Sequence, residues 1–229
     1  MATPDPFLLR PLPRARLGDV ARLLPASGTS LSVAIVEPLR VVTLRCLPGG
    51  QPALAAAVAA VGAVGNLGAV GATAANFPAA TRVVNASIAA AGATAGLPGP
   101  GRFIGVDPLL AWRGPGEWLH FSRTDAPADA LLAALPPGDA PAQAIDLSAG
   151  TLVVELQGPA LDALIARLFD ATVRLAEPGQ GTRTRLAEIA VVALRLAPRR
   201  LWLLVDRAND DYLARWLTYA ADADLSPQP

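Results

Sequence analysis

The apolar positions in the C-terminal half of the chain change their spacing from segment to segment, and each spacing predicts one element. Residues 151–157 (TLVVELQ) are rich in valine, leucine and threonine and stop at a glycine, which predicts a strand. Leucine and isoleucine then recur on one helical face over 161–168. After a polar loop, apolar runs at 189–196 and 201–206 flank the short connection APRR, which predicts a β-hairpin. The last apolar stripe predicts a helix over 210–221.

The N-terminal half shows the same order of patterns. A strand is predicted at 40–46 and a helix at 53–61. A second hairpin joins 108–113 to 117–122 through the turn Gly-Pro-Gly, and a helix over 126–135 follows it. The sequence therefore predicts an α+β fold of two similar strand–helix–hairpin–helix units, with antiparallel sheets backed by helices.

This repeat suggests a division of the chain. Residues 1–30 are an N-terminal extension, 31–136 form the first unit, 144–223 form the second and 224–229 are a tail. Prolines and glycines between the two units are typical of a boundary.

An Ala/Gly-rich insertion at about 62–101 interrupts the first unit. Two interpretations of it stay open. A short helix near 81–91 would pack closely against a neighbour because its side chains are small. Alternatively the segment is partly disordered, because alanine and glycine bury too little surface to offset their chain entropy.

Composition and charge exclude several classes of function. The 229 residues include 19 basic and 19 acidic side chains, so the chain lacks the positive excess of a nucleic-acid-binding protein. All basic residues are arginine, which excludes a lysine Schiff base and a phosphate-loop lysine. Cys46 is the single cysteine, so neither an internal disulfide nor a two-cysteine redox motif can form. The glycines of the insertion do not form a dinucleotide-binding fingerprint.

The N-terminus does not resemble a signal peptide, because prolines and arginines interrupt it. The uncharged run at 52–81 consists mainly of alanine, glycine and valine, and it lacks the leucine-rich block of a membrane span. We therefore expect a soluble, cytoplasmic protein that does not bind membranes.

The single histidine, His120, lies in the stretch RGPGEWLHFS, and it is the first candidate for a catalytic base. In the predicted hairpin it lies mid-strand, on the same face as Trp118. A histidine base requires a nucleophile and an orienting carboxylate nearby, and the sequence offers neither in a recognisable context. We interpret His120 as a packed or surface histidine, and we predict no catalytic, cofactor-binding or metal-binding residue in this chain.

Five short motifs in a fixed order make the sequence similar to a known family. They are GPGEWL at 114–119, DLS at 146–148, QGP at 157–159, GTRTRLA at 181–187 and DYLARW at 211–216. Over roughly residues 98–223 they resemble the gamma subunit of heterotetrameric sarcosine oxidase. The sequence departs from the family pattern where it reads GQGTRTR and RANDDYL, and in its Ala/Gly-rich insertion.

The resemblance implies a fold related to the folate-binding aminomethyltransferase of the glycine cleavage system. It also implies a structural subunit that packs on the alpha subunit of an oxidase acting on sarcosine or a related N-methyl amino acid. The other partners are then beta-type and delta-type subunits, and FAD, FMN, NAD and tetrahydrofolate belong to the partner subunits. Two other functions stay open, namely a stand-alone folate-dependent transferase and an unrelated assembly or adaptor protein.

Five residues are candidates for the subunit interface. Tyr212, Arg215 and Trp216 lie on the last predicted helix, and these three residue types are enriched at interface hot spots. The alternative for Trp216 is the core of the chain itself. Arg183 and Arg185 precede the second hairpin and offer bidentate contacts to carboxylates of a partner.

Overall fold

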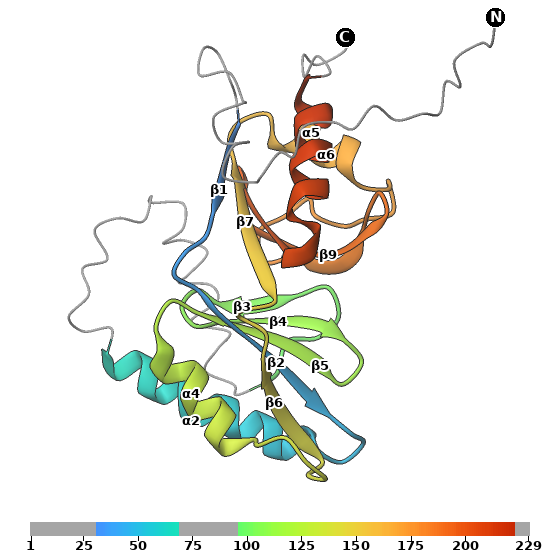
Figure 1. Cartoon of the computed structure of the whole chain (residues 1–229). Coiled ribbons are helices and arrows are strands. Elements are labelled where there is room, and N and C mark those ends of the chain that lie inside the picture. The colour runs from blue at the N-terminus through green and yellow to red at the C-terminus, as the bar shows by residue number, and fades with distance from the viewer. Residues whose placement is uncertain (1–30, 69–95, 223–229) are drawn as a thin grey trace, which may run out of the picture.

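Two antiparallel sheets of five strands each lie face to face in the computed structural model, which describes residues 31–68 and 96–222 (Figure 1). The N-terminal sheet has the order β3 (Phe103–Gly105), β4 (Leu109–Gly114), β5 (Glu117–Ser122), β2 (Arg40–Cys46) and β6 (Ala142–Asp146). The C-terminal sheet has the order β1 (Ser32–Ile35), β7 (Thr151–Gln157), β10 (Arg200–Asp206), β9 (Ile189–Ala197) and β8 (Gly181–Leu186).

Helices cover the outer face of each sheet, so the molecule has four layers (Figure 1). The helices α2 (Gln51–Gly68) and α4 (Asp125–Ala134) pack on the N-terminal sheet. The C-terminal sheet is covered by α5 (Leu161–Leu168) and α6 (Asp210–Asp222), the second of which follows a 3-10 turn at Arg207–Asn209. The predicted α+β fold of antiparallel sheets backed by helices is confirmed.

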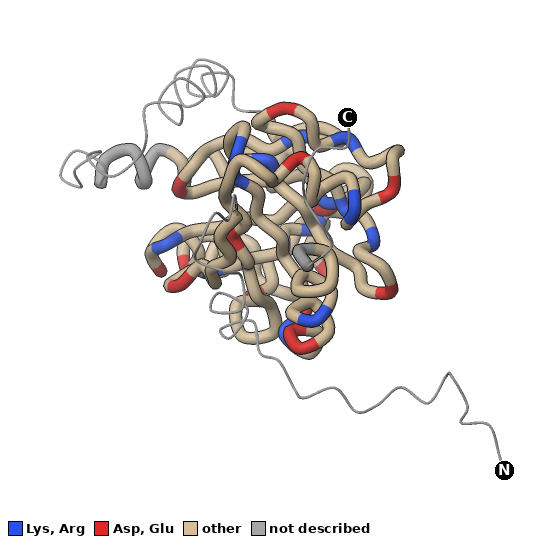
Figure 2. Tube along the Cα trace, turned by 90° about the horizontal axis from the view of Figure 1, so that it is seen from above, with Lys and Arg blue, Asp and Glu red and all other residues tan. Residues whose placement is uncertain are grey.

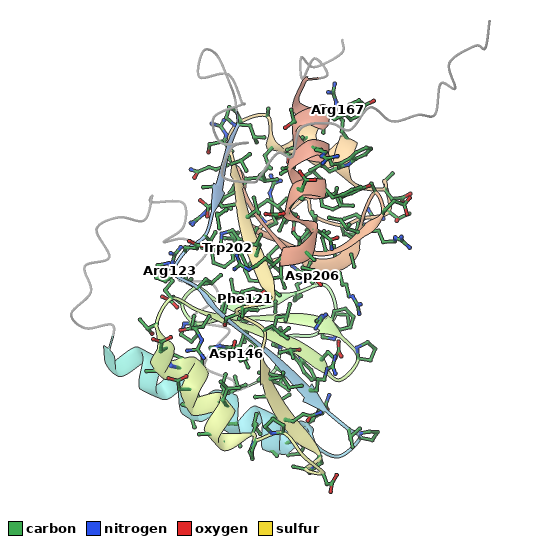
Figure 3. The ribbon with its side chains drawn as sticks, viewed as in Figure 1. Phe121, Arg123, Asp146, Arg167, Trp202 and Asp206 are labelled. Carbon is green, nitrogen blue, oxygen red and sulfur yellow. The ribbon has the colours of Figure 1, made fainter. Side chains whose placement is uncertain are left out.

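A third cluster of apolar side chains, besides the two between helices and sheets, fills the space between the two sheets. Trp202 of β10 meets Phe121 of β5 edge-on, with ring centroids 6.0 Å apart, and Figure 3 shows this pair at the boundary of the sheets. Alternate residues of β10, such as Leu203, point instead to the helices. Because both faces of these strands are buried, they read as continuous apolar runs in the sequence.

The sheets do not follow the predicted division of the chain between residues 136 and 144. The strand β1 pairs with β7 in the C-terminal sheet, and β6 pairs with β2 in the N-terminal sheet. Backbone hydrogen bonds fix both crossings, from Val36 N to Val153 O (2.9 Å) and from Leu147 N to Val41 O (2.8 Å). Each half of the chain thus supplies one strand to the sheet of the other half.

Two predicted elements differ from the observed ones. The polar loop expected before β9 is the strand β8, whose polar residues occur because it lies at a sheet edge and is exposed on one face. The helix predicted at 53–61 extends to Gly68, into the predicted insertion. The helix proposed near 81–91, the extension 1–30 and the tail 224–229 lie outside the described residues.

Arg40 ties three elements of the N-terminal half together. Its guanidinium lies 2.7 Å from Asp125, 3.2 Å from Asp129 and 2.8 Å from Asp146, and so joins β2 to α4 and β6. Asp146 also accepts hydrogen bonds from the Ser148 backbone (2.8 Å) and hydroxyl (2.6 Å). Burial alone would raise the pKa of Asp146, but the Ser148 hydrogen bonds and Arg40 outweigh it and hold this pKa below 3.8.

This depressed pKa predicts an acid-sensitive contribution to stability. A carboxylate with a lower pKa in the folded state stabilises the fold above its unfolded pKa of about 3.9, and this stabilisation is lost as the pH falls through the folded value. The Asp146→Asn variant should therefore be less stable than wild type at pH 6, and the difference should shrink below about pH 4.

Urea unfolding followed by circular dichroism between pH 3 and pH 7 measures this difference. The exposed Asp139 offers a matched control, Asp139→Asn, which should track wild type. A stability difference for Asp146→Asn that stays constant over the whole pH range would contradict the assignment.

Candidate subunit interface

The two predicted arginines lie on β8, the edge strand of the C-terminal sheet. Arg183 is opposite Val192 in the register with β9, and Arg185 is opposite Ala190. Because Val192 belongs to the core between the sheets, both arginines point to that side of the sheet, where they are exposed. Beyond β9, the described part of the chain gives β8 no strand partner, and Arg102 alone forms a bridge to Gln180.

The aromatic residues of α6 belong partly to the core. Tyr212 and Trp216 are partly buried and pack against the cluster that contains Leu213 and Leu217. The core interpretation therefore describes part of the surface of Trp216, and the interface interpretation stays a prediction. Its ring also stacks on Tyr219, with centroids 5.4 Å apart, and Tyr219 is 68% exposed.

Unpaired polar atoms lie on the same helix as this aromatic pair. Arg215 forms an ion pair with Asp211 one turn earlier on α6. Three atoms beside it are buried without a hydrogen-bond partner in the described chain, namely Asp211 Oδ1, Arg215 Nε and Trp216 Nε1. Buried polar atoms are nearly always paired in native proteins, so this surface is suited to hydrogen bonds with a second molecule or ordered water.

The turn between β8 and β9 joins one of the arginines to α6. The Glu188 backbone N–H donates to the Tyr212 hydroxyl oxygen at 3.4 Å. Arg185 donates to the Glu188 carbonyl at 3.1 Å and lies 3.4 Å from its carboxylate. We call this connected surface the α6 patch, and its members are Arg185, Glu188, Asp211, Tyr212, Arg215, Trp216 and Tyr219.

Arg183 lies outside the α6 patch, on the face of the C-terminal sheet that is turned away from α6. Arg185 points to that face too, but it contacts Glu188 in the turn beside α6. Arg183 lines a cleft with Arg113 of β4, a residue that the sequence did not single out. The predicted set of five residues therefore divides between two surfaces. Arg183 and Arg185 share one face of β8, but their surroundings differ. The strand β4 lies beside Arg183, and the turn that contacts α6 lies beside Arg185.

His120 is a packed histidine, as its strand position predicted. Its side chain is 2% exposed, and neither ring nitrogen has a hydrogen-bond partner in the described chain. Its neighbours across the sheet are Val42 and Leu110. Burial in this apolar environment lowers its pKa from 6.5 to about 4, so the ring is neutral at physiological pH.

The described residues contain no group of three His, Cys, Asp or Glu side chains placed to hold a metal ion. Within the same ranges, no helix is long and apolar enough to span a membrane. Basic and acidic residues are interspersed along the chain, and neither sign gathers on one side in Figure 2.

Comparison with known proteins finds relatives of one kind. Over 111 residues, 47% of this chain, the sequence is 33% identical to the sarcosine oxidase subunit gamma of Corynebacterium sp. (strain P-1). Over 121 residues it is 32% identical to the subunit gamma of an Arthrobacter species. The chain is similar to sarcosine oxidase gamma subunits. The matches cover 54% and 59% of those relatives, so the chain spans little more than half their length, and no family model matches it.

A solved structure shares the fold. A chain of the heterotetrameric sarcosine oxidase from Corynebacterium sp. U-96 matches with a TM-score of 0.67 and 24% identity, over 93% of this chain and 94% of that one. The aminomethyltransferase T of Bartonella henselae gives a TM-score of 0.49 and 13% identity, over 90% of this chain and 49% of that one. The resemblance read from the five sequence motifs is confirmed by the similarity to gamma subunits.

The buried His120 predicts a second pH effect on stability. The unfolded histidine binds a proton near pH 6.5 but the folded one only near pH 4, so the unfolded state binds more protons between these values. Wild type should therefore lose up to about 3 kcal/mol of unfolding free energy as the pH falls from 6.5 to 4. Leucine fills a similar volume without a titrating group, so His120→Leu should lose this dependence.

Urea unfolding between pH 5 and 7 isolates the effect, because the chain has one histidine and carboxylates titrate mainly below this range. If His120→Leu and wild type lose stability equally over this interval, the histidine is not the buried, neutral group described here.

Proposed function

We propose that this chain is the gamma-type subunit of a heterotetrameric, flavin-dependent sarcosine oxidase, in which it packs on the alpha-type subunit. The observation that carries the proposal is the sequence identity of 32–33% to subunits named gamma in sarcosine oxidases. The fold shared with a chain of such a heterotetramer over 93% of this sequence supports it.

The complex would oxidatively demethylate sarcosine or a related N-methyl amino acid and pass the one-carbon unit to tetrahydrofolate. In this proposal the alpha-type and beta-type subunits bind FAD, FMN, NAD and the folate, and a delta-type subunit completes the heterotetramer in the cytoplasm. This chain contributes contact surface rather than catalytic groups. The burial of its one histidine in an apolar layer agrees with that role.

The α6 patch is the contact surface that we assign to the alpha-type subunit. It combines an exposed tyrosine, a partly buried tryptophan and an arginine, which are the residue types that dominate binding energy at protein interfaces. Its unpaired atoms, Asp211 Oδ1, Arg215 Nε and Trp216 Nε1, would gain hydrogen-bond partners when a second chain covers them.

Removal of the exposed ring of Tyr219 tests the proposal. The full-length chain is co-expressed with a large alpha-type flavoprotein subunit of a heterotetrameric sarcosine oxidase, and the affinity of the two is measured by surface plasmon resonance. Wild type should bind, and Tyr219→Ala should bind roughly tenfold to a hundredfold more weakly, because truncation of a central aromatic residue removes most of its buried area.

Leu47 offers a matched control. It is the other large hydrophobic residue exposed in the described part of the chain, at 64%, and it follows β2 in the N-terminal half. Leu47→Ala should leave the affinity unchanged. Equal affinities of wild type and Tyr219→Ala would remove the α6 patch from the interface, and no binding by wild type would contradict the proposed function.

A further inference from the structure

A cleft of about 360 Å³ opens where the two sheets meet beside the edge strand β8. Its walls come from both sheets, because β8 lies next to β4 of the N-terminal sheet. The residues that matter for its chemistry are Arg113 on β4, Arg183 on β8, and Thr151 and Asp206 at the ends of β7 and β10. Figure 3 labels Asp206 at this boundary between the sheets.

The Arg113 guanidinium has only weak polar contacts, although its side chain is only 22% exposed. Its Nε lies 3.9 Å from Glu117 and is buried without a hydrogen-bond partner in the described chain. Its NH1 reaches the Thr43 hydroxyl only at 3.5 Å. Glu117 is instead held at 2.9 Å by another arginine, Arg45, so it does not fully compensate Arg113.

Arg183 adds a second positive charge to the same cleft. It forms no ion pair or hydrogen bond through its guanidinium with the described residues, whereas Arg185, two positions later, is paired with Glu188. Burial lowers the pKa of Arg113, Glu117 opposes this, and the charges of Arg183 and Arg45 lower it further. The two guanidiniums therefore act on each other across the cleft.

The local charge is unbalanced even though the chain is neutral as a whole. Three arginines, Arg45, Arg113 and Arg183, stand against the carboxylates of Glu117 and Asp206, which leaves an excess of one positive charge. The Asp206 carboxylate accepts the Ala208 N–H at 3.0 Å and caps the turn before α6, and it forms no ion pair with the arginines among the described residues. The guanidinium groups of Arg113 and Arg183 repel each other in this partly desolvated cleft. An anion with two oxygens offsets the repulsion because it can accept hydrogen bonds from both groups.

We propose that Arg113 and Arg183 form a docking site for a carboxylate side chain, Asp or Glu, of a partner subunit. Charge complementarity identifies the chemistry, since a carboxylate presents two acceptors that match paired guanidiniums. The exposed position of Arg183 on an edge strand makes the site accessible to another chain. The inference rests on the proposed function for the identity of the partner.

The exposed Arg199, in the turn between β9 and β10 and outside both the cleft and the α6 patch, offers a matched control. The affinity of the full-length chain for the co-expressed flavoprotein subunit is measured at about 50 and 300 mM NaCl, a range over which screening weakens exposed charge pairs. Arg183→Gln should weaken binding roughly tenfold at the lower salt and reduce the salt dependence, whereas Arg199→Gln should change the affinity less than about twofold.

Arg113→Gln should resemble Arg183→Gln. The double variant should bind no more weakly than about the worse single variant, since both arginines hold one carboxylate. Circular dichroism and thermal unfolding confirm that the variants fold, and Arg183→Gln at an exposed position keeps the test decisive if Arg113→Gln does not fold.

Three results would overturn the inference. If wild type and Arg183→Gln bind the flavoprotein subunit equally at both salt concentrations, the site does not dock it, and the proposed function stands. In the second result, sodium sulfate raises the melting temperature of wild type but not of Arg183→Gln, while both bind the flavoprotein subunit equally. The cleft then binds a small anion instead of a partner's carboxylate, and the proposed function again stands. If wild type does not bind the subunit at all, the proposed function fails together with the inference.

Discussion

The face-to-face contact of the two sheets is the constraint on which the rest of the molecule depends. Trp202 and Phe121 meet at its centre, and aliphatic residues from both sheets surround them. Each central strand is therefore buried on both faces, one against the other sheet and one against helices. Burial of both faces of these strands requires apolar residues at successive positions, in agreement with a composition of 52% hydrophobic and only 17% charged residues.

The same contact limits where the molecule can meet a partner. The exchange of β1 and β6 ties the sheets together, and the helices occupy both outer faces. The surfaces left are the outer side of the helices and the sheet edges. The α6 patch lies on the outer side of a helix, and the cleft of Arg113 and Arg183 lies at a sheet edge.

Elements with strong periodicity could be predicted from the sequence, and those set by tertiary partners could not. The two hairpins and α5 were predicted because their apolar residues repeat locally. The strand β8 was missed because an edge strand exposed on one face reads as Thr and Arg in alternation. The exchange of β1 and β6 depends on contacts between residues about a hundred or more positions apart, and no local pattern records it.

The motifs behind the resemblance are largely structural. Gly116 has φ +71° and faces the Cys46 carbonyl, which would lie 2.7 Å from an added Cβ, so only glycine fits this turn. Asp146 and Ser148 anchor the crossing between the sheets. The motif residues 181–187 and 211–216 contain the interface candidates. The contact of Arg185 with Glu188 and the position of Arg183 beside Arg113 depend on how the two sheets pack, which the motifs do not encode.

Hydrogen–deuterium exchange of the chain, free and bound to the large flavoprotein subunit, tests the central claim most directly. Binding should slow exchange in β8 and along α6, while the amides of α2 and α4 should exchange as in the free chain. Slower exchange confined to α2 and α4, with β8 and α6 unchanged, would contradict it.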